Sequence, residues 1–211
     1  MSARDASQSL ALVTVLYEAS RLFAGKGYDA TTITDVAEAA DMGEQEVVDY
    51  FPTTEAMMQA LLDHDLQKAL ESAELEAAGT GRATVRLFRY LAHDVAWVVA
   101  SPYDLTGIDR VHLIKRPEFA PWREKLDRLR ALRLSMIRQA IREGDFIRVA
   151  PEFAQESITS MIMGTLSARR GEPVDDPQEH GAELAALAIR SLLKDPAQLD
   201  EIRREAGLEA A

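Results

Sequence analysis

The fold is decided by residues 31–52, which read TTITDVAEAADMGEQEVVDYFP. Thr32 is a favourable N-cap for a short helix, and Asp35 three residues later approximates a capping box. Residues 41–43 then form a turn, because Asp tolerates an unusual backbone and Gly can cap the helix that follows. Pro52 ends this second helix, since proline cannot continue it. The stretch therefore predicts two short helices joined by a turn of three residues.

A longer amphipathic helix is predicted immediately before this pair. Apolar side chains recur from Leu12 at the spacing of a helix that buries one face, and Gly25 and Gly27 end it. Two short helices braced by a longer one form the pattern of a DNA-binding helix-turn-helix. An ordinary three-helix subdomain produces the same pattern, so both interpretations remain open at this point.

Longer helices are predicted beyond Thr54. Breaks at Gly and Pro separate periodic apolar segments, which predict helices over about 55–78, 82–100, 108–115, 118–143, 152–168 and 178–193. A final short helix or a frayed tail is expected from Asp195. No segment alternates apolar and polar residues in the manner of a strand, so we expect no sheet. The prediction is an all-α fold with an N-terminal three-helix domain over residues 1–53 and a second helical domain over residues 54–211.

Composition narrows the class of protein. The chain has 211 residues, of which 47% are hydrophobic, so it can bury a sizeable core. It contains no cysteine, which removes disulfides, thiol catalysis and Cys-based metal sites and fits a cytoplasmic location. No apolar run is long enough to span a membrane. Phosphate-binding loops, nucleophile elbows and paired-histidine metal spacings are missing, so we expect no enzyme and no cofactor.

Residues 10–57 resemble the signature of the TetR family of transcriptional regulators. The matching positions occur in the right order and phase: Leu22-Phe23, Gly27-Tyr28, Ala30-Thr31-Thr32, Asp35-Val36-Ala37, Ala39-Ala40, Tyr50-Phe51-Pro52 and Glu55-Ala56. The resemblance implies three DNA-binding helices, then about six helices that enclose an effector pocket, with the last two forming a dimer interface. It also implies a repressor that a small-molecule effector releases from operator DNA.

The second short helix departs from this family pattern. Family members usually carry basic, hydroxyl or aromatic residues there, and a lysine just after the Phe-Pro pair. This chain has Glu44, Glu46 and Asp49 on the helix and Thr54 at the lysine position. Residues 1–60 hold three basic and ten acidic residues, a net charge of −7 within a chain of net charge −11. Phosphate neutralisation supplies most non-specific DNA affinity, so this surface lacks the usual attraction.

Two functions therefore remain as alternatives. In the first, the chain is a dimeric repressor with an unusual operator interface, whose neutral side chains donate hydrogen bonds to phosphates. The candidates for these contacts are Thr31, Thr32, Gln45, Tyr50, Thr53 and Thr54. In the second, the module no longer binds DNA and acts through a protein partner or a ligand.

The resemblance also places a dimer interface and an effector pocket. Residues 152–168 and 178–193 carry broad faces of small and apolar side chains that suit packing across a two-fold axis, although intrachain core gives the same pattern. Aromatic and soft residues fall in the segments that line the pocket in TetR-like proteins, where a small apolar or aromatic effector is expected. They are Phe88, His93, Trp97, Tyr103, His112, Phe119, Trp122, Met136 and Met163, and each could equally be plain core.

Basic residues are concentrated between Arg110 and Arg148, where eleven bases face five acids. The simple interpretation is a solvated helix face with ordinary pairs four residues apart. The alternative is that this basic segment pairs with an acidic surface, either the N-terminal module of the same chain or a partner protein.

Overall fold

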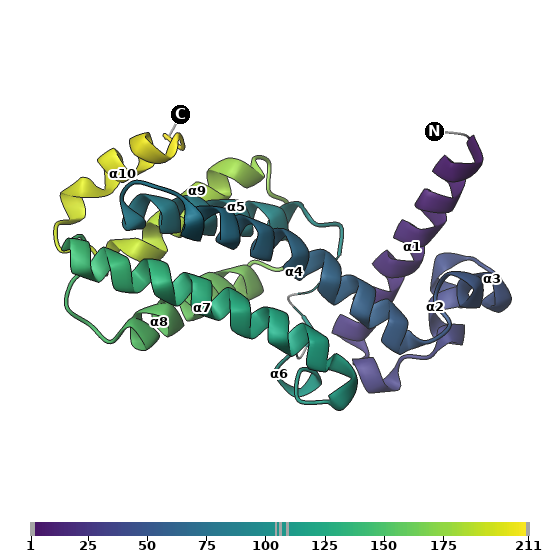
Figure 1. Ribbon diagram of the computed structural model, residues 1–211. Helices are drawn as coiled ribbons and strands as arrows, with labels where there is room; N and C mark the ends of the chain where they lie inside the picture. The colour runs from purple at the N-terminus through teal and green to yellow at the C-terminus, as the bar shows by residue number, and fades with distance from the viewer. Residues whose placement is uncertain (1–2, 104, 106, 109, 210–211) are drawn as a thin grey trace. The chain divides into compact units, whose positions relative to one another are not determined.

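The computed structural model describes residues 3–103, 105, 107–108 and 110–209, and these are predominantly helical (Figure 1). Within these ranges there is no strand, and the one isolated bridge pairs Phe146 with Leu193. The all-α class is therefore confirmed. None of the described helices is both long enough and apolar enough to cross a membrane.

Contacts between Cα atoms divide the chain into two compact units. The first contains Met1–Asp65 and Ser101–Arg123, and the second contains Leu66–Ala100 and Glu124–Ala211. The helices α4, Thr54–Ala78, and α7, Ala120–Glu143, each contribute residues to both units. The boundary predicted between residues 53 and 54 coincides with the start of α4, whereas the units divide inside that helix. As a domain boundary it stays a prediction.

The first unit begins with the expected helical module. Its elements are α1 (Ala3–Gly25), the short 3-10 helix η1 (Tyr28–Ala30), α2 (Ile33–Ala40) and α3 (Glu44–Tyr50). The capping box forms as predicted: the Thr32 hydroxyl accepts from the Asp35 N–H at 3.1 Å, and the Asp35 carboxylate accepts from the Thr32 N–H at 2.7 Å. Asp41 ends α2 in the left-handed region at φ 54°, which turns the chain into α3.

Two short elements from later in the chain complete the first unit. They are α6 (Arg110–Leu113) and the 3-10 helix η2 (Pro117–Phe119). The helix predicted over 108–115 is thus shorter than expected, and its residue 109 lies outside the described residues. Large apolar side chains from α1 and α4 form the core of this unit, with Val15, Met57 and Leu61 each fully buried.

The second unit is organised around α5, Ala83–Ala100, in which nearly every side chain from Ala83 to Leu91 is buried. The other elements are α8 (Pro151–Ala168), α9 (Pro177–Arg190), the 3-10 helix η3 (Pro196–Gln198) and α10 (Leu199–Ala206). The helix α9 lies very close to α5, because a Cβ atom added at Gly181 would stand 2.2 Å from the Ala92 carbonyl oxygen. Only glycine allows this approach.

The last long helix ends three residues earlier than predicted. We expected a helix to Leu193, whereas α9 ends at Arg190. The residues that follow bond to the segment after α7 instead: the Ile147 N–H donates to the Leu192 carbonyl, and the Lys194 N–H donates to the Asp145 carbonyl, each at 2.8 Å. This pairing joins segments nearly fifty residues apart, so local periodicity does not reveal it.

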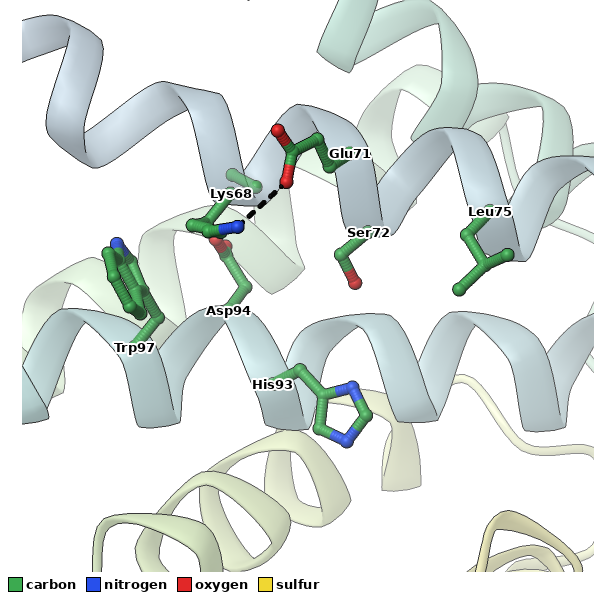
Figure 2. A pocket seen from close by; sticks show the side chains of 8 residues that line it. Lys68, Glu71, Ser72, Leu75, His93, Asp94 and Trp97 are labelled. Atoms are coloured by element: carbon green, nitrogen blue, oxygen red, sulfur yellow. Dashed lines mark hydrogen bonds and ion pairs between the residues drawn. The ribbon is translucent and has the colours of Figure 1, made fainter.

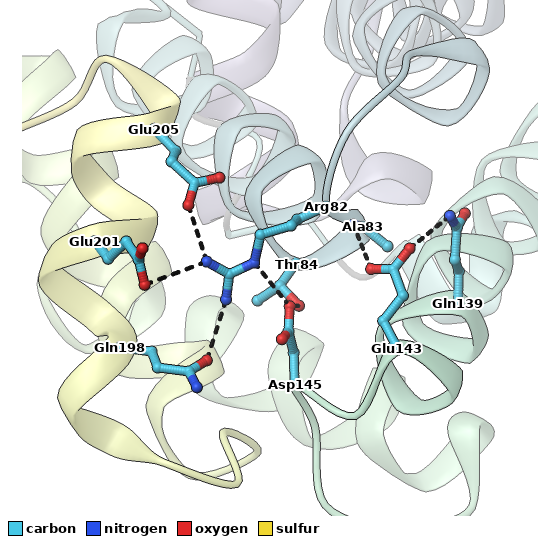
Figure 3. A network of polar contacts seen from close by, with 9 residues as sticks. All are labelled: Arg82, Ala83, Thr84, Gln139, Glu143, Asp145, Gln198, Glu201 and Glu205. Carbon is cyan, nitrogen blue, oxygen red and sulfur yellow. Dashed lines mark hydrogen bonds and ion pairs between the residues drawn. The ribbon is translucent and has the colours of Figure 1, made fainter.

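A polar network fixes the C-terminal helix α10 to the start of α5 (Figure 3). Arg82 donates to Asp145 at 3.2 Å, to Glu205 at 2.9 Å and to Gln198 at 3.1 Å. The Thr84 hydroxyl also donates to Asp145, at 2.8 Å. Of the two sequence-based expectations for the C-terminus, a short helix is therefore the one observed.

Candidate nucleic-acid interface and effector cavity

The outward face of α3 is acidic. Val47, with no exposed surface, anchors the inner face of this helix. The side chains exposed to solvent are Glu44, Gln45, Glu46 and Asp49. The Gln45 amide donates to the Asp49 carboxylate at 3.1 Å. The helix therefore presents three carboxylates and one amide, and that amide already has a partner.

The hydroxyl groups proposed for phosphate contacts lie in different environments. Thr31 is buried, and its hydroxyl donates to the Gly27 carbonyl at 2.8 Å, so a phosphate contact would require that bond to break. Thr32 and Thr53 are exposed caps, and the Thr53 hydroxyl accepts from the Ala56 N–H at 3.0 Å. Thr54 and Tyr50 are half-buried. The predicted DNA contacts of these residues and of Gln45 stay predictions.

Positive charge near α3 is scarce and already paired. No lysine or arginine occurs between Gly27 and Gln67, a range that contains all of α2 and α3. Lys26 donates to Asp35 at 2.6 Å. The hydrogen bonds from Lys26, and then those from Thr32, lower the pKa of Asp35 to about 2. Asp35 is therefore a carboxylate at all physiological pH values, and Lys26 is committed to it.

The whole first unit is acidic, not only its recognition helix. Its sequence ranges contain seven basic and fifteen acidic residues, a formal net charge of −8. Arg21, another of its few cations, pairs with Glu18 at 3.0 Å. A polyanion that approaches this unit meets net repulsion, and close contact must come from directed hydrogen bonds.

One residue of the basic segment does pair with the N-terminal module. Arg116 donates two hydrogen bonds to the carboxylate of Asp29, at 2.8 and 2.5 Å, and its guanidinium lies 5.4 Å from the ring centre of Tyr28. The Arg116 hydrogen bonds lower the pKa of Asp29. The ring of Tyr28 also meets that of Phe119 edge-on, with centroids 5.9 Å apart. These contacts hold residues 116–119 against η1.

Three other bases of this segment behave as an ordinary helix face. Arg128 pairs with Glu74 at 2.7 Å, Arg138 with Glu152 at 2.7 Å and Arg130 with Glu156 at 3.7 Å, all within the second unit and all substantially exposed. Pairs of this kind contribute little stability. The segment therefore includes contacts of both kinds, the three exposed pairs above and the pairing of Arg116 with Asp29 of the module.

Four of the predicted effector contacts belong to the first unit. Phe119 and Trp122 are buried, and the Trp122 indole donates to the Leu62 carbonyl at 3.2 Å, as in an ordinary core. The Tyr103 ring packs edge-on against His64 at 4.8 Å, and burial raises the pKa of Tyr103 while it lowers that of His64. His112 is exposed.

A cavity of about 340 Å³ lies between α4 and α5 in the second unit (Figure 2). Two of the predicted effector residues, His93 and Trp97, line it. Its other lining residues are Lys68, Ala69, Glu71, Ser72, Leu75 and Asp94. Of the remaining candidates in this unit, Phe88 and Met136 are fully buried core and Met163 is half-buried outside the cavity lining.

Sequence reasoning missed the α4 wall of this cavity. Lys68, Ser72 and Leu75 are spaced four and three residues apart and so share one face of α4. That spacing identifies a common face but not the helix opposite. Asp94 lies three residues before Trp97, on the same face of α5, and its residue type alone does not assign it to a cavity.

Asp94 is held from the interior by Tyr90. The Tyr90 hydroxyl, fully buried, donates to the Asp94 carboxylate at 3.3 Å. Burial, together with the nearby carboxylate, raises the pKa of Tyr90 well above its ordinary value. The phenol therefore stays protonated and acts as a permanent donor that orients Asp94.

Large apolar side chains remain exposed on α8 and α9. Phe153 and Met161 on α8 are 62% and 38% exposed, and Leu187 on α9 is 58% exposed. In contrast, Ile158 and Ile162 of α8 are buried within the second unit. The broad apolar faces predicted for these helices therefore divide between intrachain core and an uncovered surface.

The module matches a known family in sequence. The model for bacterial regulatory proteins of the tetR family matches residues 15–61, which run from α1 into α4. A bacterial regulatory protein of the tetR family from Rhodococcus RHA1 has a similar structure, with 25% identity and a TM-score of 0.66, over 88% of this chain and 98% of its own. This chain therefore contains the regulatory module of the tetR family. No curated protein matches its sequence significantly.

Two further structures extend the likeness in fold to the helical part beyond the module. Mycobacterium smegmatis AmtR is 22% identical, with a TM-score of 0.76, over 93% of this chain and 94% of its own. KstR2, a ketosteroid transcriptional regulator of Mycobacterium tuberculosis, is 20% identical, with a TM-score of 0.71, over 86% of this chain and 94% of its own. At these identities the likeness concerns the fold.

Proposed function

We propose that this chain is a TetR-family regulator, a dimeric repressor that binds operator DNA through α3 and is released by a small-molecule effector. The observation that carries the proposal is the α2-turn-α3 geometry: a capped α2, a left-handed Asp41 and a short α3 that is anchored by Val47 and exposed on its other face. A helix presented in this way fits the major groove of DNA.

The chemistry of α3 suits base recognition better than phosphate binding. Carboxylates accept hydrogen bonds from cytosine N4, and an amide can bond adenine through two atoms. Glu44, Glu46 and Asp49 supply the first type of contact and Gln45 the second. Positioning on the phosphates then falls to neutral donors such as the exposed Thr53. The Thr32 hydroxyl is also exposed, but it already donates to Asp35 at 2.7 Å and would have to leave that bond. We expect an operator complex with few ionic contacts and a shallow dependence on salt.

Dimerisation is proposed through α8 and α9. Phe153, Met161 and Leu187 give these helices an uncovered apolar surface. Gly164, with no atom within 4 Å of its added Cβ position, leaves room on α8 for a close neighbour. A two-fold axis at this face would bury the same side chains from both protomers.

The operator proposal is tested with the DNA immediately upstream of the gene. A gel-shift titration at low salt, with and without candidate effectors, is expected to show a discrete complex containing two protomers. If no complex forms at micromolar dimer under any of these conditions, the repressor proposal is wrong for that site. An arbitrary duplex of equal length is the control for non-specific binding.

A second candidate function is favoured by the charge of the first unit. Its formal net charge is −8, and Lys26 and Arg21 are both paired to carboxylates. Such a module is suited to binding a basic protein surface. In that case the gel shift fails for all DNA, and reversing Glu44 and Glu46 to Lys abolishes capture of the protein partner.

We propose a binding role rather than catalysis for either function. The described residues hold no cluster of three His, Asp or Glu that could bind a metal ion. The cytoplasmic location inferred from the cysteine-free composition also stays a prediction.

A further inference from the structure

We infer that the α4–α5 cavity, lined by the eight residues named above, binds an organic cation with an apolar body. Calling this cation the effector rests on the proposed function, but the binding itself does not. The inference depends on three features of the cavity: its apolar walls, its excess of carboxylates, and the placement of an indole beside a carboxylate.

The apolar walls come from Leu75 and Trp97. Leu75 is 72% exposed, more than Phe153 or Leu187, and Trp97 is only half-buried. Figure 2 shows Leu75 pointing from α4 toward α5, and Trp97 rising from α5 toward α4. A ligand between them would remove apolar surface of both from water. The volume of about 340 Å³ suits a molecule with one aromatic ring or a short branched chain.

Carboxylates outnumber cations in the cavity. Glu71 and Asp94 contribute two negative charges, and Lys68 contributes the single lysine or arginine charge of the lining. Lys68 donates to Glu71 at 3.0 Å (Figure 2). Hydrogen bonds from Gln67 and then Lys68 lower the pKa of Glu71, which keeps it ionised. Outside the lining, Arg133 forms a hydrogen bond with the Tyr90 hydroxyl and offsets part of the Asp94 charge from the protein interior. At the cavity wall itself, an anionic ligand would meet two carboxylates, whereas a cation would be attracted by them.

The indole and the Asp94 carboxylate lie on one face of α5. Positions 94 and 97 are three residues apart, so their side chains are neighbours along the helix. A cationic group placed beside Asp94 would lie within reach of the π-face of Trp97, the aromatic side chain that attracts cations most strongly. Because the Tyr90 hydroxyl holds Asp94 at 3.3 Å, this carboxylate is already oriented before a ligand arrives. The net charge of −11 also steers cations toward the protein.

Binding is measurable without DNA, because the chain has only two tryptophans. In a Trp122→Phe variant, the fluorescence of Trp97 alone reports on the cavity. The probes are benzyltrimethylammonium, benzyl alcohol and phenylacetate, which carry the same ring with a positive, zero and negative charge. We expect saturable quenching by the cation, at least tenfold weaker binding of the alcohol, and none of phenylacetate. The same titrations are repeated by calorimetry on the unmodified chain. The result therefore does not depend on whether the Trp122→Phe variant folds well.

Three variants separate a built site from general attraction to an acidic protein. Asp94→Asn is expected to weaken cation binding about tenfold, and Trp97→Leu about fivefold or more. Asp127→Asn removes the same charge from an exposed position on α7 outside the cavity and is expected to leave the affinity unchanged. Equal affinity for cation and alcohol, or equal losses in Asp94→Asn and Asp127→Asn, would overturn the inference.

The outcome is distinguishable from that of the proposed function. A chain that binds operator DNA but not benzyltrimethylammonium refutes the cation site and leaves the repressor proposal intact. A chain that binds the cation but no DNA supports the site and refutes the repressor proposal. If both bind, release of DNA by the cation tests whether the occupant of the cavity is an effector.

Discussion

Replacing Gly181 by alanine tests the close contact between α9 and α5. The new Cβ atom would lie 2.2 Å from the Ala92 carbonyl oxygen, 3.1 Å from the Ala96 nitrogen and 3.2 Å from the Ala92 carbonyl carbon. All three are backbone atoms in the interior of α5, so no side-chain rotation can relieve the contact. The helix α9 must instead move away from α5 by roughly 1 Å, which loosens the packing along both helices.

The magnitude follows from two opposing effects. Alanine favours a helix over glycine by about 1 kcal/mol. Overpacking a well-filled core costs about 1–3 kcal/mol. The cost of a clash with backbone atoms lies at the upper end of this range or above it, because the backbone cannot rotate away. We therefore expect Gly181→Ala to lower the free energy of unfolding by about 2 kcal/mol. For a chain of this size the melting temperature should fall by about 4–8 °C.

Urea and thermal unfolding followed by circular dichroism at 222 nm measure this change. Gly25→Ala is the matched control, because Gly25 also has a helical position but no atom within 4 Å of its added Cβ. The control should be as stable as the unmodified chain or more stable by up to about 1 kcal/mol. If Gly181→Ala unfolds at the same urea concentration as the control, the close α5–α9 packing is refuted.

Three further predictions concern the module and the dimer. The Asp35 carboxyl should titrate with a pKa of about 2 by NMR, and this pKa should rise toward its ordinary value in Lys26→Met. Because the pKa is lower in the folded state, the contribution of Asp35 to stability is present above about pH 4 and is lost as the pH falls toward 2. An Asp35 midpoint that Lys26→Met leaves unmoved would refute the pairing. Glu44→Gln with Glu46→Gln should raise non-specific DNA affinity several-fold in fluorescence anisotropy, whereas Glu179→Gln on α9 should not. Leu187→Glu should weaken dimerisation at least a hundredfold in analytical ultracentrifugation, because each protomer loses an apolar contact and buries a charge. Leu75→Glu, a comparable change on α4, should leave the dimer intact.

The fold was predictable wherever the signal is local. The Thr32 and Asp35 capping box, the turn at residues 41–43 and the break at Pro52 depend on neighbours within a few residues, and each appears as predicted. The end of α9 was not predictable in this way. Its position depends on hydrogen bonds between residues 192–194 and residues 145–147, which the periodicity of residues 178–193 does not encode.

The candidate site was predictable only in part, for a related reason. Residue type identified His93 and Trp97, which line the cavity, but it selected Phe88 and Met136 equally, and these are core. An apolar side chain looks the same in sequence whether it faces a cavity or the interior. The polar wall of α4, with Lys68 and Ser72, carries no signal until the helix opposite it is known.

The charge of the module was evident from the sequence, and the structure adds its local consequences. Arg116 donates hydrogen bonds to Asp29 of the module, although the two residues are 87 positions apart in the sequence. The hydroxyl of Thr31, a candidate for phosphate contact, donates its hydrogen bond to the Gly27 carbonyl. Hydrogen-bond partners of this kind decide which polar groups remain available to a ligand, and they follow from the folded backbone.

The central claim, that α3 recognises DNA with few ionic contacts, is tested most directly by the salt dependence of operator binding. Fluorescence anisotropy with a labelled upstream duplex should show specific binding by two protomers, with an affinity that falls by less than about tenfold between 50 and 200 mM salt. A repressor that depends on many phosphate contacts loses about a thousandfold or more over the same range. A loss of that size would contradict the account of α3, and the absence of specific binding at 50 mM salt would contradict its role in DNA recognition altogether.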